Sequence, residues 1–311
     1  MDPLLTDTRL AKRIARAGLC SRRDAEAWIA AGRVAVNGQV VSAQGVRVHK
    51  SDRIEVDGLP LPAPAKAQVW ALHKPRGVVV TAEDPQGRRS LADLLPKTGP
   101  RLMPVGRLDI NSEGLILLTN DGELERRLEL PETGLERRYR VRVYGQVSDK
   151  ALAALREGLE IDGLRYGAIT AFPERQDTLA AGQNRWLRFY LKEGKNREVR
   201  KVCAHLGLAV NRLVRIAYGP IRLDGLAKGQ LEPLTARQLR ELMGEDVGAK
   251  QGWARAKPKR RKPPRPGAAK AYALQAPQAL RKAQIETQTE AQTHARAKTL
   301  HPSRPRTPPK R

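Results

Sequence analysis

Residues 104–124, PVGRLDINSEGLILLTNDGEL, place charged side chains directly before an apolar run. Arg107 and Asp109 stand two residues apart, ahead of Gly114 and the aliphatic residues 115–118. The pattern is open to three interpretations: a solvated turn, a metal or phosphate site, and a catalytic carboxylate. A carboxylate can act as a nucleophile at an anomeric carbon, or it can stabilise a transition state that resembles an oxocarbenium ion.

Sugar chemistry of the glycosidase type needs a second carboxyl group as general acid. Glu113, Asp121 and Glu123 are near in sequence, but Asp121-Gly122 is typical of a turn after a strand at 115–119. We therefore expect these three carboxylates to face solvent. A reaction whose leaving group is already a reasonably stable anion, such as uracil leaving a ribose, could proceed with Asp109 alone.

Several kinds of chemistry are disfavoured by what the sequence lacks. It contains no GxxxxGK[ST] loop, no GxGxxG after an expected strand and no HExxH, and its three histidines before residue 247 are isolated from one another. Cys20 and Cys203 are far apart and form no zinc motif, so both are expected to be buried thiols. We expect no metal and no cofactor, and any chemistry falls to Asp, Glu, Tyr, Arg and Lys.

The charge balance indicates a polyanionic partner. Among the 311 residues, 58 Lys and Arg outnumber 33 Asp and Glu, for a net charge of +25. This favours RNA, DNA or an anionic membrane. No apolar run approaches the roughly 20 residues that span a bilayer, and the N-terminus has no signal-peptide core, so we expect a soluble cytoplasmic protein without a membrane partner.

Composition divides the chain into four parts. A small first domain, residues 1–58, precedes a Pro- and Ala-rich linker, 59–68; residues 69–246 form the second domain; and 247–311 form a basic, Pro-rich tail. The tail has too few aliphatic residues to offset the entropy of ordering, so it is predicted to be disordered. It is interpreted either as a solvating tail or as a salt-sensitive electrostatic tether to RNA.

The first domain is predicted to contain two short helices and a hairpin. Residues 9–17 place apolar side chains on one helical face, and Ser21 is a typical N-cap for a second helix that ends near Gly32. Asn37-Gly38 between valine-rich segments predicts a type I′ turn. Arg22, Arg23 and Arg33 lie near the junction of helix and hairpin, where they could grip backbone phosphates.

The second domain alternates strands with a few helices. Residues 69–81 are predicted to form two short strands around a turn at 74–77; 137–145 and 185–194 each form a strand; and 148–159 and 196–208 each form a helix. Residues 210–219 are expected to form a strand with Arg212 and Arg215 on one basic edge. This order predicts an α+β fold with a mixed, largely antiparallel sheet flanked by helices.

Two resemblances follow from these residues. SRRDAEAWIAAGRVAVNG, within residues 8–57, is similar to the alpha-L motif, the RNA-binding domain of ribosomal protein S4. GRLDINSEGLILLTNDGEL resembles the signature of the pseudouridine synthases that modify ribosomal RNA and carry such a domain in front. HKPRGVVVT, RRYRVRVYG and EGKNREVRKVCAHLGLAVNRLVRIAYGPIRL extend the likeness over residues 8–240, and it is greatest to the branch that modifies large-subunit RNA.

The pseudouridine synthase resemblance implies roles for individual residues. Asp109 corresponds to the catalytic aspartate, Tyr139 to the tyrosine against the target base and Arg200 to the basic partner of the aspartate. Arg107 resembles the arginine that fills the space left by the flipped nucleotide. Whether the aspartate bonds to the sugar or assists loss of a 2′ proton stays open.

Partners and alternatives follow from the same resemblance. Lys195, Asn196 and Arg197 precede a helix, where they could bind phosphates, although a plain polar loop is an alternative interpretation. We expect a cofactor-free monomer acting on ribosomal RNA or a ribosomal precursor particle. Action on small-subunit RNA or tRNA, a non-catalytic assembly factor and a hydrolytic nucleosidase are the alternatives.

Overall fold

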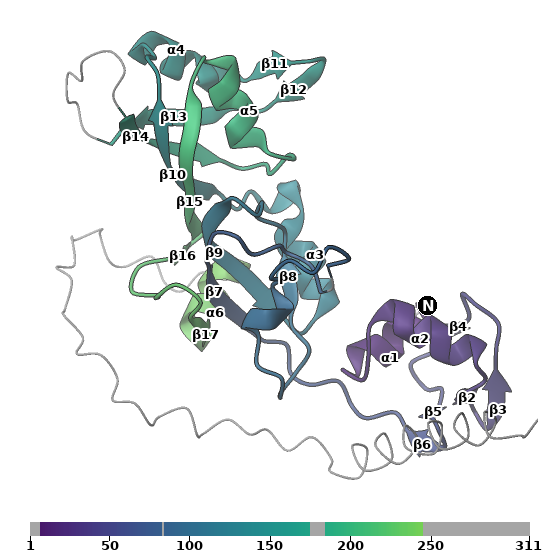
Figure 1. Cartoon of the computed structure of the whole chain (residues 1–311). Coiled ribbons are helices and arrows are strands. Elements are labelled where there is room, and N and C mark those ends of the chain that lie inside the picture. The colour runs from purple at the N-terminus through teal and green to yellow at the C-terminus, as the bar shows by residue number, and fades with distance from the viewer. Residues whose placement is uncertain (1–6, 83, 175–183, 245–311) are drawn as a thin grey trace, which may run out of the picture. The chain divides into compact units, whose positions relative to one another are not determined.

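A computed structural model of the chain describes residues 7–82, 84–174 and 184–244 (Figure 1). The predicted tail therefore lies outside the described residues. None of the helices in the described ranges combines the length and the apolarity that crossing a bilayer requires.

The N-terminal part agrees with its sequence pattern. Helices α1 (Leu10–Arg16) and α2 (Arg22–Ala30) precede a four-stranded sheet of order β3-β2-β5-β6, whose strands are β2 (Val34–Val36), β3 (Gln39–Val41), β5 (Ile54–Val56) and β6 (Leu59–Pro60). Strands β1 (Thr8–Arg9) and β4 (Arg47–Val48) form a separate pair. Ser21 and Asp24 complete a capping box at the start of α2. Asn37 and Gly38 both have positive φ, 52° and 83°, as the predicted type I′ turn requires.

A nine-stranded sheet organises the rest of the described chain. Its main path is β13-β14-β10-β15-β9-β7-β17, with β8 paired to β9 and β16 paired to β15. The strands are β7 (Val69–Lys74), β8 (Met103–Val105), β9 (Ser112–Thr119), β10 (Arg137–Tyr144), β13 (Ile169–Pro173), β14 (Asn184–Leu191), β15 (Ala209–Tyr218), β16 (Ile221–Arg222) and β17 (Leu231–Pro233). The strand pairs of this sheet are antiparallel except that β15 runs parallel to β9. The predicted mixed, largely antiparallel α+β fold is confirmed.

Helices and a hairpin complete this domain. The helices are α3 (Gly122–Glu129), α4 (Asp149–Ala154), α5 (Glu198–His205) and α6 (Ala236–Met243), with short 3-10 turns η1 (Ala92–Leu94), η2 (Pro131–Thr133) and η3 (Leu155–Glu157). Strands β11 (Leu159–Ile161) and β12 (Leu164–Tyr166) pair with each other as a hairpin. Leu152 of α4 and Val199 of α5 both pack in the apolar cluster that contains Val141 of β10 and Leu187 of β14.

Two apolar clusters fix the sheet between these helices. Val199, Val202 and Cys203 of α5 pack with Val141 and Val143 of β10 in the larger cluster. On the other half of the sheet, side chains of β7, β8 and β9 pack with Leu128 of α3 and Leu242 of α6. The two predicted buried thiols are confirmed, and burial raises the pKa of both Cys20 and Cys203 to about 12.

Three predictions were wrong in part. The segment after residue 77 forms no strand and makes only a single parallel bridge between Val79 and Ser90. Asp121 is not a simple turn residue: its carboxylate accepts from the backbone N–H groups of Glu123 and Leu124 and caps helix α3. Arg215 does not share a basic edge with Arg212, because Arg215 is buried and its Nε donates to the carbonyl of Leu115 at 2.7 Å.

Candidate active site

The loop that carries Asp109 runs from the end of β8 into β9, at the middle of the nine-stranded sheet. The apolar sequence explains its position: Val105 and Leu108 are buried on either side of the exposed Arg107. Strand β9 then follows with all eight residues buried, so the loop is fixed at both ends. Asp109 itself stays partly open, with a side chain 25% exposed. A carboxylate in that position can meet a substrate without being desolvated completely.

Lys74 is the residue that holds this loop from beneath. Its side chain is fully buried at the end of β7, and its Nζ donates to the carbonyls of Asp109 at 3.1 Å, Ser112 at 2.8 Å and Pro75 at 3.2 Å. An ammonium group has three N–H donors, so these three acceptors satisfy it completely. Burial lowers the pKa of Lys74 to about 8, against the opposing effect of the charges of Asp109 and Glu113. At neutral pH it therefore remains mostly protonated and keeps all three donors.

Backbone hydrogen bonds give the loop further support. The N–H of Gly77 donates to the carbonyl of Ile110 at 2.8 Å, and that of Ser112 donates to the carbonyl of Asp109 at 3.0 Å. The sequence interpretation placed Lys74 in a turn and gave it no role. The available signal was the segment HKPRG, in which a lysine ends an apolar strand and directly precedes a proline.

Arg200 brings the positive charge of α5 to Asp109. Its Nε lies 3.4 Å from Asp109 Oδ2. This contact is an ion pair rather than a well-aligned hydrogen bond, since this Nε has no hydrogen-bond partner among the described residues. Its Nη2 donates to the carbonyl of Asn111 at 3.1 Å and to Ser112 Oγ at 3.3 Å. Arg200 thus contacts the same loop at three residues, and its side chain is only 15% exposed. Burial lowers the pKa of Arg200, while the charge of Asp109 opposes that shift.

Two further arginines surround the pair. Arg197 Nη1 lies 3.8 Å from Asp109 Oδ2. Burial is the main cause of the lowered pKa of Arg200, and the positive charges of Arg197 and Arg76 lower it further. Arg76 and Arg197 are exposed, so their guanidinium groups remain available to an anionic ligand. The sequence interpretation included Arg197 among the phosphate contacts and missed Arg76.

Tyr139 lies on the same face of the sheet as α5. It is 8% exposed and belongs to the apolar cluster that contains Leu108, the neighbour of Asp109, and Val199 of α5. In the sheet, Tyr139 of β10 pairs with Phe189 of the neighbouring strand β14 and with Arg215 of the other neighbour, β15. The structure therefore brings Asp109 and Arg200 into contact and places Tyr139 in the adjoining core.

The start of α5 is built around a buried acid. Glu198 is 3% exposed. Its Oε2 accepts from the backbone N–H of Lys195 at 2.8 Å, and its Oε1 has no hydrogen-bond partner in the part of the chain that the structure describes. Burial and the neighbouring Glu193 raise the pKa of Glu198 to about 8, whereas hydrogen bonds from Lys195 and Gly167 lower the pKa of Glu193 against the effect of burial. At neutral pH Glu198 is therefore mostly neutral, beside a Glu193 whose pKa is lowered. This pair holds the segment in which Arg197 adopts a left-handed φ of 53°.

The other proposed RNA contacts differ in how free they are. Arg22, Arg23 and Asn196 are exposed. Arg33 already forms a two-point ion pair with Asp57, at 2.8 and 2.5 Å, and lies 4.7 Å from the ring centroid of Trp28. Lys195 forms an ion pair with Glu193 at 2.8 Å. The side chains of Arg33 and Lys195 are therefore already engaged in ion pairs within the protein, whereas those of Arg22, Arg23 and Asn196 are exposed.

The nearby carboxylates are not distributed as predicted. Glu113 is 4% exposed, not solvent-facing: Arg212 donates to its Oε1, and Lys228 Nζ lies 3.2 Å from its Oε2. Asp121 is taken up as the cap of α3. The exposed Glu123 forms an ion pair and is the one member of the three that faces solvent as predicted.

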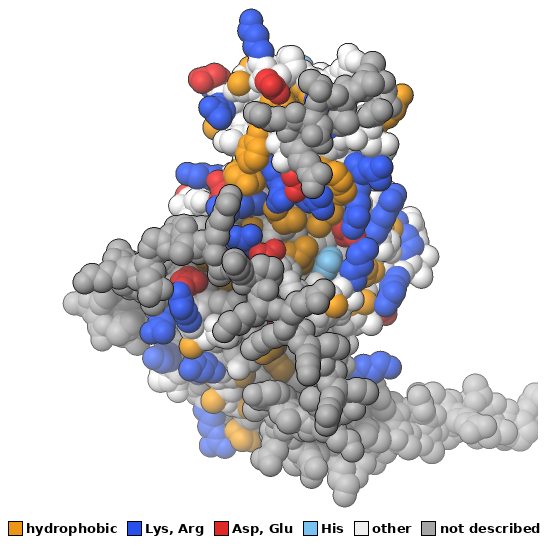
Figure 2. All heavy atoms as spheres, turned by 90° about the vertical axis from the view of Figure 1, so that its left-hand side faces the viewer, with side chains coloured by type: hydrophobic (Ala, Val, Ile, Leu, Met, Phe, Trp, Pro, Cys, Tyr) orange, Lys and Arg blue, Asp and Glu red, His pale blue; other side chains and the backbone are white. Residues whose placement is uncertain are grey.

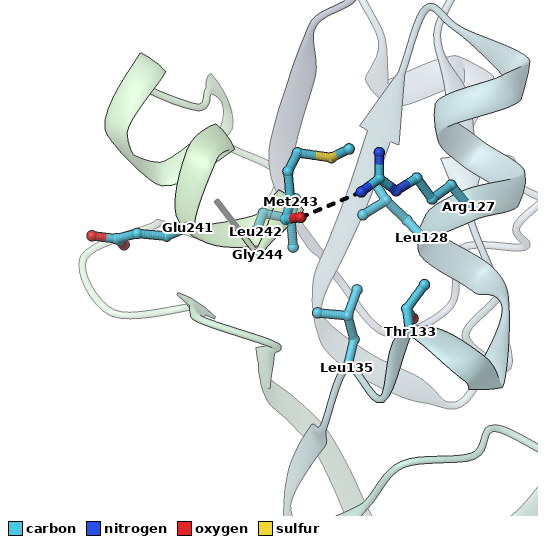
Figure 3. Close-up of a pocket in the computed structure, with 8 residues that line it drawn as sticks. All are labelled: Arg127, Leu128, Thr133, Leu135, Glu241, Leu242, Met243 and Gly244. Atoms are coloured by element: carbon cyan, nitrogen blue, oxygen red, sulfur yellow. Dashed lines mark hydrogen bonds between the residues drawn. The ribbon is translucent and has the colours of Figure 1, made fainter. Parts of the chain in front are cut away.

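A pocket of about 270 Å³ lies between α3, the segment 133–135 and the end of α6 (Figure 3). Leu128, Leu135 and Leu242 line it, and Arg127 Nη2 donates to the carbonyl of Met243 at 3.4 Å across it. None of its lining residues belongs to the Asp109 loop or to α5. It is a separate feature from the candidate active site.

Comparison with known proteins agrees with this geometry. A family model described as RNA pseudouridylate synthase matches residues 68–205, and one described as S4 domain matches residues 8–54. An uncharacterized RNA pseudouridine synthase of Rickettsia felis is 42% identical over 234 residues, covering 74% of this chain and 98% of that protein. The ribosomal large subunit pseudouridine synthase B of Haemophilus influenzae is 43% identical over 253 residues, covering 78% of this chain and 70% of that protein.

A solved structure, the crystal structure of a pseudouridylate synthase, superposes with a TM-score of 0.53 at 28% identity and covers 75% of this chain and 99% of that one. Both predicted resemblances are thereby confirmed, including the S4-type domain in front. The chain therefore belongs to the RNA pseudouridine synthases and is an enzyme of that family.

Proposed function

We propose that this enzyme isomerises a specific uridine of ribosomal RNA, in the large subunit, to pseudouridine. The relatives named ribosomal large subunit pseudouridine synthase B support the choice of substrate. The observation that carries the catalytic proposal is the ion pair between Asp109 and Arg200, on a loop that Lys74 anchors through three backbone carbonyls.

The reaction needs no cofactor in this proposal. The target nucleotide leaves its stack, and Arg107, exposed two residues before Asp109, takes its place. The bond between ribose C1′ and uracil N1 breaks, the base turns, and a bond forms between C1′ and C5. The proton leaves C5, and N1 gains one, so atoms and electrons balance without redox change.

Each side chain has a distinct part in these steps. Asp109 acts at the sugar, either by bonding to C1′ or by assisting loss of the 2′ proton. Arg200 fixes the direction of the carboxylate, because a planar guanidinium forms directional contacts with it and with the loop. Tyr139 presents its ring to the uracil and its hydroxyl to the C5 proton.

RNA contacts outside the reacting nucleotide come from cationic side chains. Arg76 and Arg197 flank the site, and Lys195 and Asn196 lie next to Arg197. In the S4 domain Arg22, Arg23 and Arg33 contact phosphates, which give affinity more than sequence choice. The protein acts as a monomer on naked ribosomal RNA or on a precursor particle.

The test is tritium release from ribosomal RNA labelled at uracil C5. The full-length protein is expected to release tritium without changing the RNA mass, and Asp109→Asn to reduce release by a factor on the order of 10⁴. Asp224→Asn is the matched control, because Asp224 is an exposed aspartate paired with Arg222. Full activity of Asp109→Asn would disprove the assignment. Tritium release only from small-subunit RNA or tRNA would assign that RNA as the substrate instead. Loss of the mass of uracil from the RNA would identify a nucleosidase.

A further inference from the structure

The half of the sheet that carries Tyr139 has a second face, which no helix of the described residues covers. Side chains alternate along β10, so Tyr139, Val141 and Val143 point to α5 while their neighbours point the other way. We call this second face the open face. It comprises Arg138, Arg140, Arg142, Tyr144, Phe172, Trp186, Arg188, Tyr190 and Arg212.

Figure 2 views the molecule from this side. Blue basic and orange apolar side chains lie close together over the strands of the upper half, with a few acidic ones between them. The chain has four Trp, six Tyr and two Phe residues in all, and four of these aromatic residues lie on the open face. Five arginines share that face with them. Such a concentration is not needed for folding, since the core lies on the other side.

The arginines and the aromatic rings are stacked on one another. The guanidinium carbon of Arg140 lies 4.0 Å from the ring centroid of Trp186, and that of Arg212 lies 5.9 Å from the same centroid. Arg138 lies 5.2 Å from the ring centroid of Tyr190. Stacking restrains the guanidinium groups, and each one keeps N–H donors that its Nε ion pair does not use.

Carboxylates hold these arginines without neutralising the face. Glu174 pairs with both Arg140 and Arg188, while Glu136 pairs with Arg138. Arg142 is exposed and forms no ion pair within the described residues. Two arginines thus share one acid and a third has none, so positive charge remains in excess and the side chains are preorganised.

We propose that the open face is a second RNA-binding surface, which takes a segment of the substrate RNA outside the segment held at Asp109. Fixed guanidinium groups suit phosphates, and exposed aromatic edges suit unstacked bases of looped RNA. The inference rests on the proposed function, because a long ribosomal RNA held at the active site supplies the second segment at high local concentration. An acidic protein could contact the same arginine and aromatic residues, but the substrate RNA is already held at the active site, which favours RNA as the occupant.

The test compares two double variants of equal charge change. Arg140→Gln/Arg142→Gln alters the open face, and Arg222→Gln/Arg237→Gln removes two exposed, ion-paired arginines from β16 and α6. Filter binding measures Kd across a range of salt concentrations. The probes are a large-subunit ribosomal RNA transcript and a short uridine-containing single strand that only the active site can hold.

For the transcript, the open-face variant is expected to raise Kd on the order of tenfold and to lower the salt slope by about one or two. The control variant and the short strand are expected to show neither change. Equal Kd values for the two double variants would overturn the proposal and leave the face to an acidic protein partner. If the double variant does not fold, Arg142→Gln alone serves, because Arg142 has no ion pair to lose; an unchanged salt slope there also overturns the proposal.

Activity separates this inference from the proposed function. If wild-type protein releases tritium normally while the open-face variant binds the transcript like the control, only the second surface is disproved. If no ribosomal RNA yields pseudouridine, the proposed function fails whatever the binding measurements give.

Discussion

The two faces of strand β10 place adjacent residues in opposite physical settings. Tyr139 faces the apolar core beneath α5, near the loop of Asp109, whereas Arg138 and Arg140 on the open face stack on aromatic rings and pair with carboxylates. Contacts on the active-site face join residues far apart in the chain, and each donor group of Arg200 is directed at a particular acceptor. Contacts on the open face join side chains of adjacent strands through stacking and through a shared carboxylate. We therefore expect catalytic precision to depend on the first face, and electrostatic attraction of RNA on the second.

Gly114→Ala should have the largest effect of these changes, a large loss of folding stability in the strands that carry the active-site face. Gly114 has φ of 110°, and an added Cβ would lie 2.2 Å from the carbonyl oxygen of Arg215, at the parallel junction of β9 and β15. Backbone cannot yield as a side-chain tip can, so we expect a loss of more than about 4 kcal/mol in unfolding free energy. Urea unfolding measures it. In the control, Gly122→Ala, the new Cβ meets atoms only at 3.8 Å and should cost little.

Arg200→Lys tests whether the active-site face needs a guanidinium rather than a charge. Lysine cannot contact Asp109, Asn111 and Ser112 together from one planar group. We expect kcat to fall on the order of 10²–10³-fold, as when one oriented donor is lost. Single-turnover tritium release gives the number. Arg140→Lys on the open face should leave single-turnover release within a few-fold of wild type, and equal losses in both variants would erase the contrast between the faces.

Alkaline pH should weaken the active site through Lys74. Its pKa is lowered to about 8, so above that pH the amine keeps two donors for three carbonyls and the Asp109 loop loosens. We expect kcat to decline as pH rises through about 8, and Lys74→Met to lower kcat roughly tenfold or more and remove that decline. A wild-type profile that stays flat past this pH would count against the anchor.

Stability responds to Lys74 in the opposite sense. The pKa of Lys74 in the folded protein lies below the usual 10.5. Its contribution to the free energy of unfolding is therefore complete above about pH 10.5 and is lost as pH falls through about 8. Activity and stability should therefore diverge between these pH values in wild type but not in Lys74→Met.

Glu198→Gln should have the smallest effect and sharpen the account of the start of α5. Because its pKa is raised to about 8, Glu198 contributes stability that is complete below its usual 4.5 and is lost as pH rises toward 8. A glutamine can accept from Lys195 and donate to Glu193 at every pH. Relative to wild type, Tm of the variant should rise by roughly 2–4 °C or more between about pH 5 and pH 8.5. Parallel Tm curves for the two proteins would contradict the raised pKa of Glu198.

Local pattern alone determined most elements of this protein. Ser21 and Asp24 define the start of α2, and Asn37-Gly38 defines the first hairpin, because caps and tight turns depend on adjacent residues. The alternation of 137–144 likewise predicted β10. The motif resemblance identified Asp109, Tyr139 and Arg200, with roles that remain proposals.

Only the tertiary structure decided which charges meet. Glu113 appeared solvent-exposed, yet β15 and Lys228 enclose it, and Lys74 appeared to lie in a turn, yet it is the buried anchor of the loop. The contact between Asp109 and Arg200 spans two elements that are remote in sequence. Hydrogen bonds within a turn are fixed by neighbouring residues, whereas the burial and pairing of a charge depend on which distant strand or helix lies across from it.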